Sequence, residues 1–224
     1  MANFPSTRRS ILEAAQSDIL ELRQQAAESI AEAYWKPAYK YIRLKWNANI
    51  DDAEDLAQGF FTSVVERGLI GKYDPSKAAF RTYLRTCIDG YIQNHRKAAT
   101  RLKRGGNFNF AEAEHEIADT ADSAEDIFHR EWQRHMFSLA ISDLRRQNTN
   151  PTRLAVFERY DLAPDVNQRP TYDDIARELN IPVTTVTNHL SAARRELKRC
   201  LLARLSGITS SDSELRREAE YLLS

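Results

Sequence analysis

The chain has 224 residues, and its 32 Lys and Arg balance its 32 Asp and Glu, so the formal net charge is zero. Helical periodicity dominates and strand-like alternation is scarce, which excludes a β-rich fold and predicts an all-α protein long enough for two small domains. Because we see no apolar leader and no run of 18 apolar residues, we expect a cytoplasmic protein without membrane insertion.

Residues that commonly carry catalysis or bind metal are sparse and scattered. Cys87 and Cys200 each fall on the apolar side of a predicted helix, which is typical of reduced core thiols. The five histidines are dispersed, and no Cys/His spacing fits zinc. We therefore expect no enzyme activity, no metal and no cofactor.

Residues 1–104 are predicted to form four or five helices, with 17 Lys and Arg against 12 Asp and Glu. The periodicity predicts helices over 10–25, over 28–46 with a break or bend at Pro37, and over 52–67 with Asp51 or Asp52 as the cap. A fourth helical stretch covers 78–104, and we expect a kink or short loop at Asp89-Gly90.

The helix predicted over 52–67 carries carboxylates opposite its apolar stripe. Glu54 and Asp55 lie one turn before the amide Gln58. Paired carboxylates can bind metal or transfer protons, yet no histidine and no Gly-rich phosphate loop lies nearby. They can also complement the helix dipole, or present an acidic docking surface to a basic partner.

The stretch 78–104 carries a basic face interrupted by one acid, Asp89. The basic residues are Arg81, Arg85, Arg96, Lys97, Arg101, Lys103 and Arg104, and the rings of Phe80, Tyr83 and Tyr91 lie among them. A basic face follows phosphates, and flat rings stack on unpaired bases. The alternative is a solvated amphipathic helix with core aromatics.

Residues 105–126 contain seven acids and no Lys or Arg, beginning at Gly105-Gly106. We interpret this segment as a flexible, self-repelling acidic linker between two domains. The remainder, 127–224, holds 15 Lys and Arg against 13 acids. The neutral total therefore conceals two basic parts separated by an acidic one.

After the linker, helices are predicted near 127–147 and 152–161, followed by an exposed loop over 162–170. Residues 171–199 then have the pattern of a helix-turn-helix: Thr171 or Asp173 caps the first helix, Asn180 suits a left-handed turn, and Pro182 prevents continuation. The predicted core positions are Ile175, Ala176, Leu179, Val186, Leu190, Ala193 and Leu197. Such a motif places its second helix in the DNA major groove; the alternative is a plain helical hairpin.

The order of these parts resembles a bacterial RNA polymerase sigma factor of the compact extracytoplasmic-function (ECF) class. The resemblance rests on DAEDLAQGFF (52–61), YDPSKAAFRTYL (73–84), the basic run ending KRGG (103–106) and the C-terminal helix-turn-helix, and extends to TRRSIL (7–12) and YWKPAYKYIR (34–43). It implies a sigma region 2-like domain over 1–104, a flexible acidic linker over 105–126, a region 4-like helix-turn-helix domain over 127–205, and a tail over 206–224 that could cover the helix-turn-helix.

The resemblance also implies partners and contact residues. The partners are core RNA polymerase, through the clamp helices of its largest subunit and its flap region, and promoter DNA; the free chain is expected to be a monomer. Polymerase docking falls to Glu54, Asp55, Leu56, Gln58 and Phe61. Recognition and melting of the −10 element fall to Arg81, Tyr83, Arg85, Gly90, Asn94, Arg96, Lys97 and Arg101. Reading of the −35 element falls to Thr184, Thr185, Thr187, Asn188, His189, Arg194 and Arg195.

The sequence departs from the family pattern at several of these positions. Gly59 stands where a Glu is usual, Tyr83 replaces a Trp, Gly90 replaces an Asn that reads a base, and His189 and Ala192 stand where Arg is frequent. We therefore expect weaker polymerase docking and a modest affinity for the −35 element.

Regulation is implied by the resemblance, through an anti-sigma factor or a Ser/Thr kinase. Thr62 and Ser63 follow Gln58 by about one turn, so a phosphate there would add negative charge near Gly59. Two other functions fit the same sequence. One is a stand-alone helix-turn-helix regulator, and the other is a helical polymerase-binding adaptor without promoter specificity.

Overall fold

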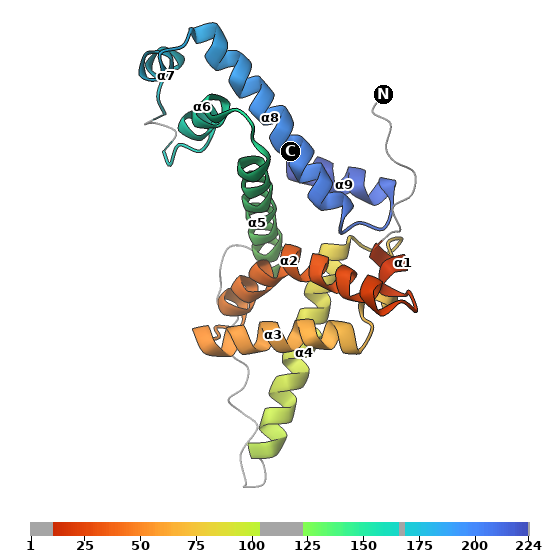
Figure 1. The fold of residues 1–224 in the computed structure, drawn as a ribbon. Coiled ribbons are helices and arrows are strands. Elements are labelled where there is room, and N and C mark those ends of the chain that lie inside the picture. Colours follow the sequence, from red (N-terminus) through yellow and green to blue (C-terminus); the bar gives the residue numbers. More distant parts are fainter. Residues whose placement is uncertain (1–10, 104–122, 166–168, 224) are drawn as a thin grey trace. The chain divides into compact units, whose positions relative to one another are not determined.

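The computed structural model describes residues 11–103, 123–165 and 169–223, and all regular secondary structure among them is helical, with no strand (Figure 1). The all-α class predicted from the sequence is thus confirmed. The structure divides the chain into two compact units: unit 1 comprises Met1–His135 and Leu205–Ser224, and unit 2 comprises Met136–Arg204.

Unit 1 is built on four helices that surround an aromatic core. They are α2 (Leu20–Lys45), α3 (Ile50–Glu66), α4 (Phe80–Lys103) and the first half of α5 (Ala124–Gln147). The short helices α1 (Ile11–Ala15) and η1 (Ile70–Lys72) and the C-terminal helix α9 (Asp212–Leu223) complete it. The interruption between the first two helices lies between Ala15 and Leu20. The sequence placed it near residue 26, so the predicted helices over 10–25 and 28–46 are wrongly divided.

Two predicted interruptions are absent. The helix α2 continues through Pro37, and α4 continues through Asp89-Gly90. Gly90 has an ordinary negative φ within α4, and a Cβ added there would meet no atom within 4 Å. The short loop predicted at Asp89-Gly90 is therefore absent, because helix packing outweighs the propensity cost of about 1 kcal/mol for one glycine.

The start of α3 is fixed by Asn49 rather than by an aspartate. The side-chain oxygen of Asn49 accepts a hydrogen bond from the Asp52 backbone N–H at 2.8 Å. The prediction that Asp51 or Asp52 caps this helix is therefore wrong. Both aspartates instead lie in the first turn, where negative charge complements the helix dipole.

Aromatic side chains from three helices pack together in the core of unit 1. The ring of Tyr34 stacks on Trp132 with centroids 6.0 Å apart and meets Phe80 edge-on at 5.6 Å. Tyr41 meets Phe128 edge-on at 5.4 Å. All five are nearly or fully buried, and such ring pairs add to the burial of apolar area. The core thus ties α4 to α2 and α5.

The acidic linker predicted over 105–126 lies mostly outside the described residues, but its last part is helical. Ser123 caps α5: its hydroxyl accepts the Asp126 backbone N–H at 3.2 Å and donates to the Asp126 carboxylate at 2.7 Å. Glu125 and Asp126 therefore belong to the first turn of α5.

Unit 2 contains the second half of α5, α6 (Pro151–Asp161), α7 (Tyr172–Leu179) and α8 (Val183–Ser206) up to Arg204. Thr171 caps α7 in a reciprocal pair with Asp174, and Asn180 is left-handed with φ 50° and ψ 50°. Helix α8 begins two residues after Ile181. The buried core shared by α6, α7 and α8 consists of Val156, Ile175, Ala176, Val186 and Leu190.

The compact units do not follow the predicted domain limits. The first half of α5, through His135, and residues 205–224 belong with unit 1. In α9, Glu214 bonds to Tyr73, and Glu218 pairs with Arg81. Residues of unit 1 thus occupy the buried face of α9, and whether the tail also covers the helix-turn-helix stays a prediction.

Candidate protein and nucleic-acid interfaces

The outer face of α3 presents carboxylates that have no counter-charge. Glu54, Asp55 and Gln58 are exposed, and neither acid forms an ion pair with any described residue. Leu56 is half-buried, whereas Phe61 is only 9% exposed and packs edge-on against Phe60 at 5.2 Å. The structure thus separates the predicted docking residues into an exposed polar set and an apolar pair that supports it.

The two hydroxyls proposed as phosphorylation sites on α3 differ sharply in access. Thr62 is exposed, and its hydroxyl donates to the Gln58 carbonyl at 3.0 Å. Ser63 is 6% exposed, and its hydroxyl donates to the Phe60 carbonyl at 2.7 Å. Of the two hydroxyls, only that of Thr62 belongs to a residue exposed to solvent, and both sites stay predictions.

Gly59 has a structural explanation that the sequence did not provide. A Cβ built at Gly59 would lie 2.4 Å from the Tyr91 hydroxyl oxygen. Tyr91 also packs edge-on against Phe60 at 5.7 Å. The absence of a side chain at this position of α3 therefore permits the close approach of a ring from α4.

In the first three turns of α4, the basic residues are internally paired. Arg81 pairs with Glu218, and its guanidinium lies over the ring of Tyr221 at 4.0 Å and over that of Trp132 at 5.5 Å. Its side chain is only 11% exposed. Arg81 is therefore not available to DNA in this arrangement.

Asp89 is the centre of a polar cluster between α2 and α4. Its carboxylate accepts hydrogen bonds from the Tyr41 hydroxyl at 3.0 Å, the Lys45 ammonium at 2.9 Å, the Trp46 indole N–H at 3.2 Å and the Arg85 guanidinium at 3.2 Å. The single acid on this helix thus holds α4 against α2, and it engages Arg85 in doing so.

The remaining aromatic residue proposed for DNA melting is anchored as well. The hydroxyl of Tyr83 donates to the Leu69 carbonyl at 2.8 Å, and its ring lies 5.4 Å from that of Tyr73. Burial raises the pKa of Tyr83 well above its usual value. Tyr83 therefore packs at the start of α4 rather than presenting a free ring.

The exposed part of α4 is its second half. Asn94, Arg96 and Lys97 are exposed. The Arg96 guanidinium donates a hydrogen bond to the Trp46 carbonyl at 2.9 Å and lies 4.7 Å from the centroid of the Trp46 ring. Arg101 lies on the helix, although its side chain is outside the described part of the structure. Within the helix, α4 thus changes from internally paired to solvent-facing.

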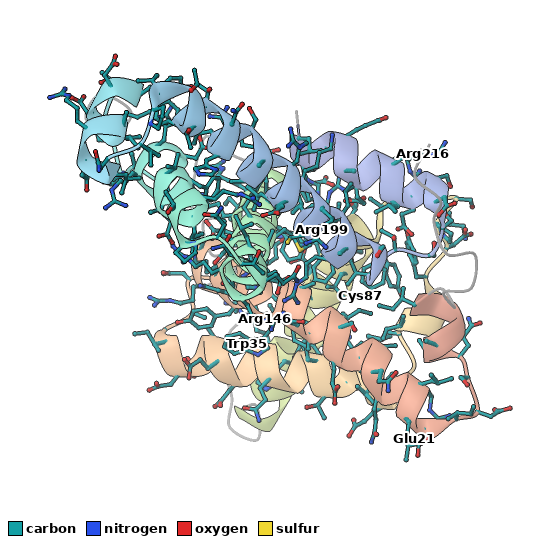
Figure 2. All side chains as sticks on the ribbon, turned by 45° about the horizontal axis from the view of Figure 1, so that its top comes forward. Glu21, Trp35, Cys87, Arg146, Arg199 and Arg216 are labelled. Atoms are coloured by element: carbon teal, nitrogen blue, oxygen red, sulfur yellow. The ribbon has the colours of Figure 1, made fainter. Side chains whose placement is uncertain are left out.

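The residues proposed for reading DNA lie on the N-terminal part of α8. Thr184, Asn188 and Arg195 are exposed, whereas Thr185, Thr187 and His189 are half-buried. The spacing 184, 188, 191 and 195 marks one face of a helix. The sequence analysis missed Ser191 and Lys198, which are exposed there too, although helical spacing alone could have identified them. Arg199, labelled in Figure 2, is also exposed.

One predicted contact of this helix is already engaged within unit 2. The Arg194 guanidinium donates twice to the Asp161 carboxylate, at 2.7 and 2.8 Å, and lies over the Tyr160 ring at 5.9 Å. Half of its side chain nevertheless remains exposed. Arg194 thus links α8 to α6, whereas Arg195 forms no such ion pair with a described residue.

The described residues contain no group of three or more His, Cys, Asp or Glu arranged to hold a metal ion. None of the described helices is long and apolar enough to cross a membrane.

Burial, followed by the nearby Arg81, lowers the pKa of His129 to about 4, so this histidine is neutral at pH 7. The two exposed polar surfaces described for unit 1 are an acidic face on α3 and a polar, partly basic end on α4.

Residues 32–102, about a third of the chain, match the family model described as Sigma-70 region 2. The match covers more than half of α2, all of α3 and nearly all of α4, so this part of the chain is similar to sigma-70 region 2. No curated protein and no solved structure matches the chain.

Proposed function

We propose that the protein is an ECF-type sigma factor that uses α3 to dock on core RNA polymerase. The observation that carries this proposal is the exposed, uncompensated pair Glu54 and Asp55, with Gln58 one turn later, within the region 2 match. Because these charges have no internal partner, no ion pair has to be broken before they attract a basic partner. The clamp helices of the largest polymerase subunit are the proposed partner, and the flap region is the proposed partner of the helix-turn-helix.

The second half of α4 is the proposed surface for the −10 element. Asn94 and Lys97 face solvent, and Arg96 and Arg101 extend the same end of the helix. Gly90 leaves the backbone of α4 uncovered, with no atom within 4 Å of its missing Cβ. A basic end with an amide side chain suits phosphates and unpaired bases.

Helix α8 is the proposed reader of the −35 element, within the functional segment predicted over 127–205. Thr184, Asn188 and Arg195 lie on its outer face, where hydroxyl, amide and guanidinium groups can reach base edges and phosphates. Thr185, Thr187 and His189 flank this face. The bond of Arg194 to Asp161 reduces the basic charge available, which supports a modest −35 affinity.

Three further elements of the proposal concern assembly and control. The free chain is a monomer, and the acidic linker follows the polymerase cleft where nucleic acid normally runs. An anti-sigma factor or a Ser/Thr kinase restrains the protein, and Thr62 is the proposed phosphate acceptor on the docking face. Thr62→Ala and Thr62→Glu should then change the affinity for polymerase in opposite directions. If neither variant changes this affinity, Thr62 is not a regulatory site.

The docking proposal is tested by reversing one charge on α3. Asp55→Arg should weaken binding to core RNA polymerase by more than about 30-fold, because it places a cation against a basic partner. The matched control is Glu21→Arg, an exposed acid on α2 outside the region 2 match (Figure 2). Fluorescence anisotropy gives the affinities and circular dichroism checks the fold. Equal affinities for the two variants would contradict docking through α3.

A further inference from the structure

Three carboxylates from outside the region 2 match contact the start of α4 and the turn before it. Glu125 on α5 accepts a hydrogen bond from Thr82 at 3.2 Å and lies 3.9 Å from the Arg85 guanidinium. Glu214 and Glu218 on α9 contact Tyr73 and Arg81. Acids from two helices far apart in sequence thus converge on the polar residues of one short segment.

The contact between α9 and Arg81 is closed to solvent. The side chains of Arg81 and Glu218 are 11% and 6% exposed. Tyr221, three residues after Glu218, lies 4.0 Å from the Arg81 guanidinium, and Trp132 lies on another side at 5.5 Å. A carboxylate and a flat ring on one guanidinium reproduce the two groups, phosphate and base, that a single-stranded nucleic acid offers to arginine.

Glu214 makes a second polar contact on the buried face of α9. It is 1% exposed and accepts hydrogen bonds from the Tyr73 hydroxyl at 2.5 Å and from the Ser210 backbone N–H at 2.7 Å. Burial is the main cause that raises the pKa of Glu218 above its usual range. Glu214, Glu218 and Leu222 follow one another at intervals of four residues, so acids occupy positions that an ordinary amphipathic helix gives to apolar residues.

A face of this kind suits a reversible contact. Burying an ion pair costs desolvation that offsets most of its Coulomb energy, so the pair specifies where α9 binds more than it stabilises the fold. The helix has 12 residues, and an isolated helix of that length is marginal in water. The Nε of Arg81 is buried and has no hydrogen-bond partner among the described residues, whereas a phosphate can engage the guanidinium at two nitrogens.

We propose that α9 is an intramolecular cap, in which Glu218 and Tyr221 occupy Arg81 in place of single-stranded DNA. This inference rests on the proposed function and extends its −10 surface to Arg81, which the resemblance implies is a contact of the melted strand. In the free protein the cap keeps Arg81 from nucleic acid, and release of α9 exposes it. The exposed end of α4, with Asn94 and Lys97, is unaffected by the cap.

The test compares two charge reversals on α9. Glu218→Lys places a cation against Arg81 and expels the helix, whereas Glu220→Lys makes the same charge change at an exposed position. The probe is a fluorescein-labelled, mixed-sequence single-stranded DNA of 20 nucleotides. We expect the full-length Glu218→Lys chain to bind about tenfold more tightly than Glu220→Lys, with a steeper salt dependence. Adding Arg81→Ala should remove this difference. Equal affinities, or a gain that survives Arg81→Ala, would overturn the cap.

A second variant guards against a folding artefact. A chain ending at Ser210 lacks α9 but keeps the buried residues Ile208 and Thr209. We expect it to unfold cooperatively, to show faster amide exchange over residues 80–88, and to bind the probe about tenfold more tightly than the intact chain. If both this chain and Glu218→Lys lose cooperative unfolding, α9 is a structural part of unit 1 and the proposal is wrong. Polymerase is absent from these assays, so failure to bind polymerase would affect only the proposed function.

Discussion

The helices α3 and α4 lie in the same unit, and both carry rows of charged residues, but they use these charges in opposite ways. On α3, Glu54 and Asp55 face solvent without a counter-charge among the described residues. On α4, Arg81 and Arg85 are each paired, with Glu218 and Asp89 respectively. Charge pattern therefore gives the sign of a surface, while only the fold shows whether the charge is available to a partner.

The largest effect expected from this comparison is at Asp89. Asp89→Ala removes the acceptor shared by Tyr41, Lys45, Trp46 and Arg85. It leaves the half-buried Lys45 without a carboxylate and Arg85 with only the more distant Glu125, at 3.9 Å. We expect unit 1 to lose about 3 to 5 kcal/mol of unfolding free energy. Urea denaturation followed by circular dichroism measures the loss.

The matched variant on α3 is Asp55→Ala, which removes an exposed carboxylate. We expect it to change the unfolding free energy by less than about 0.5 kcal/mol. If the two aspartates proved equally costly to remove, the contrast between a paired α4 and an unpaired α3 would be wrong.

A second prediction concerns acid stability, because His129 is held neutral beside Arg81. Its pKa is lowered to about 4 in the folded protein, against about 6.5 when unfolded. Between these values the unfolded state binds more protons, so stability falls as the pH is lowered from about 6.5 toward 4. The full difference corresponds to roughly 3 kcal/mol.

The variant His129→Gln removes this titration and should flatten the decrease between pH 6.5 and 4. Thermal or urea unfolding across that range measures the slope for both proteins. An unchanged slope in the variant would show that His129 is accessible to protons in the folded state and that the start of α4 is less closed than its contacts indicate.

The smallest predicted effect concerns the packing contact between α3 and α4. In Gly59→Ala, the new Cβ meets the Tyr91 hydroxyl at 2.4 Å, so overpacking of about 1 to 3 kcal/mol outweighs a helix-propensity gain of about 1 kcal/mol. In a Tyr91→Phe background the hydroxyl is gone, and the same change should stabilise by up to about 1 kcal/mol. A double-mutant cycle measures this coupling, and additive effects would show that the two residues do not meet.

The sequence predicted the elements that local rules control. Thr171 as the cap of α7, left-handed Asn180, and the core positions Ile175 and Val186 follow from capping, backbone preference and periodicity, and the structure has them all. The exposure of Glu54 and Asp55 likewise follows from their place opposite the apolar stripe of α3.

What the sequence missed depends on contacts between distant segments. Gly90 indicated a break that Asp89 prevents by binding four donors. Arg81 and Tyr83 were predicted to face DNA, but residues such as Glu218, 137 positions away, lie against α4. Gly59 was interpreted as a lost carboxylate, and its fit to Tyr91 needed the packing of α3 on α4. The pattern of acids at 214 and 218 in line with Leu222 was the one available signal for α9.

The most direct test of the central claim is complex formation with core RNA polymerase followed by transcription from a mapped start. The account predicts that the purified full-length chain co-elutes with core polymerase and directs initiation at specific sites, and that Asp55→Arg abolishes both while leaving the helical fold intact. A chain that fails to co-elute, or that co-elutes equally well with Asp55 reversed, would contradict it.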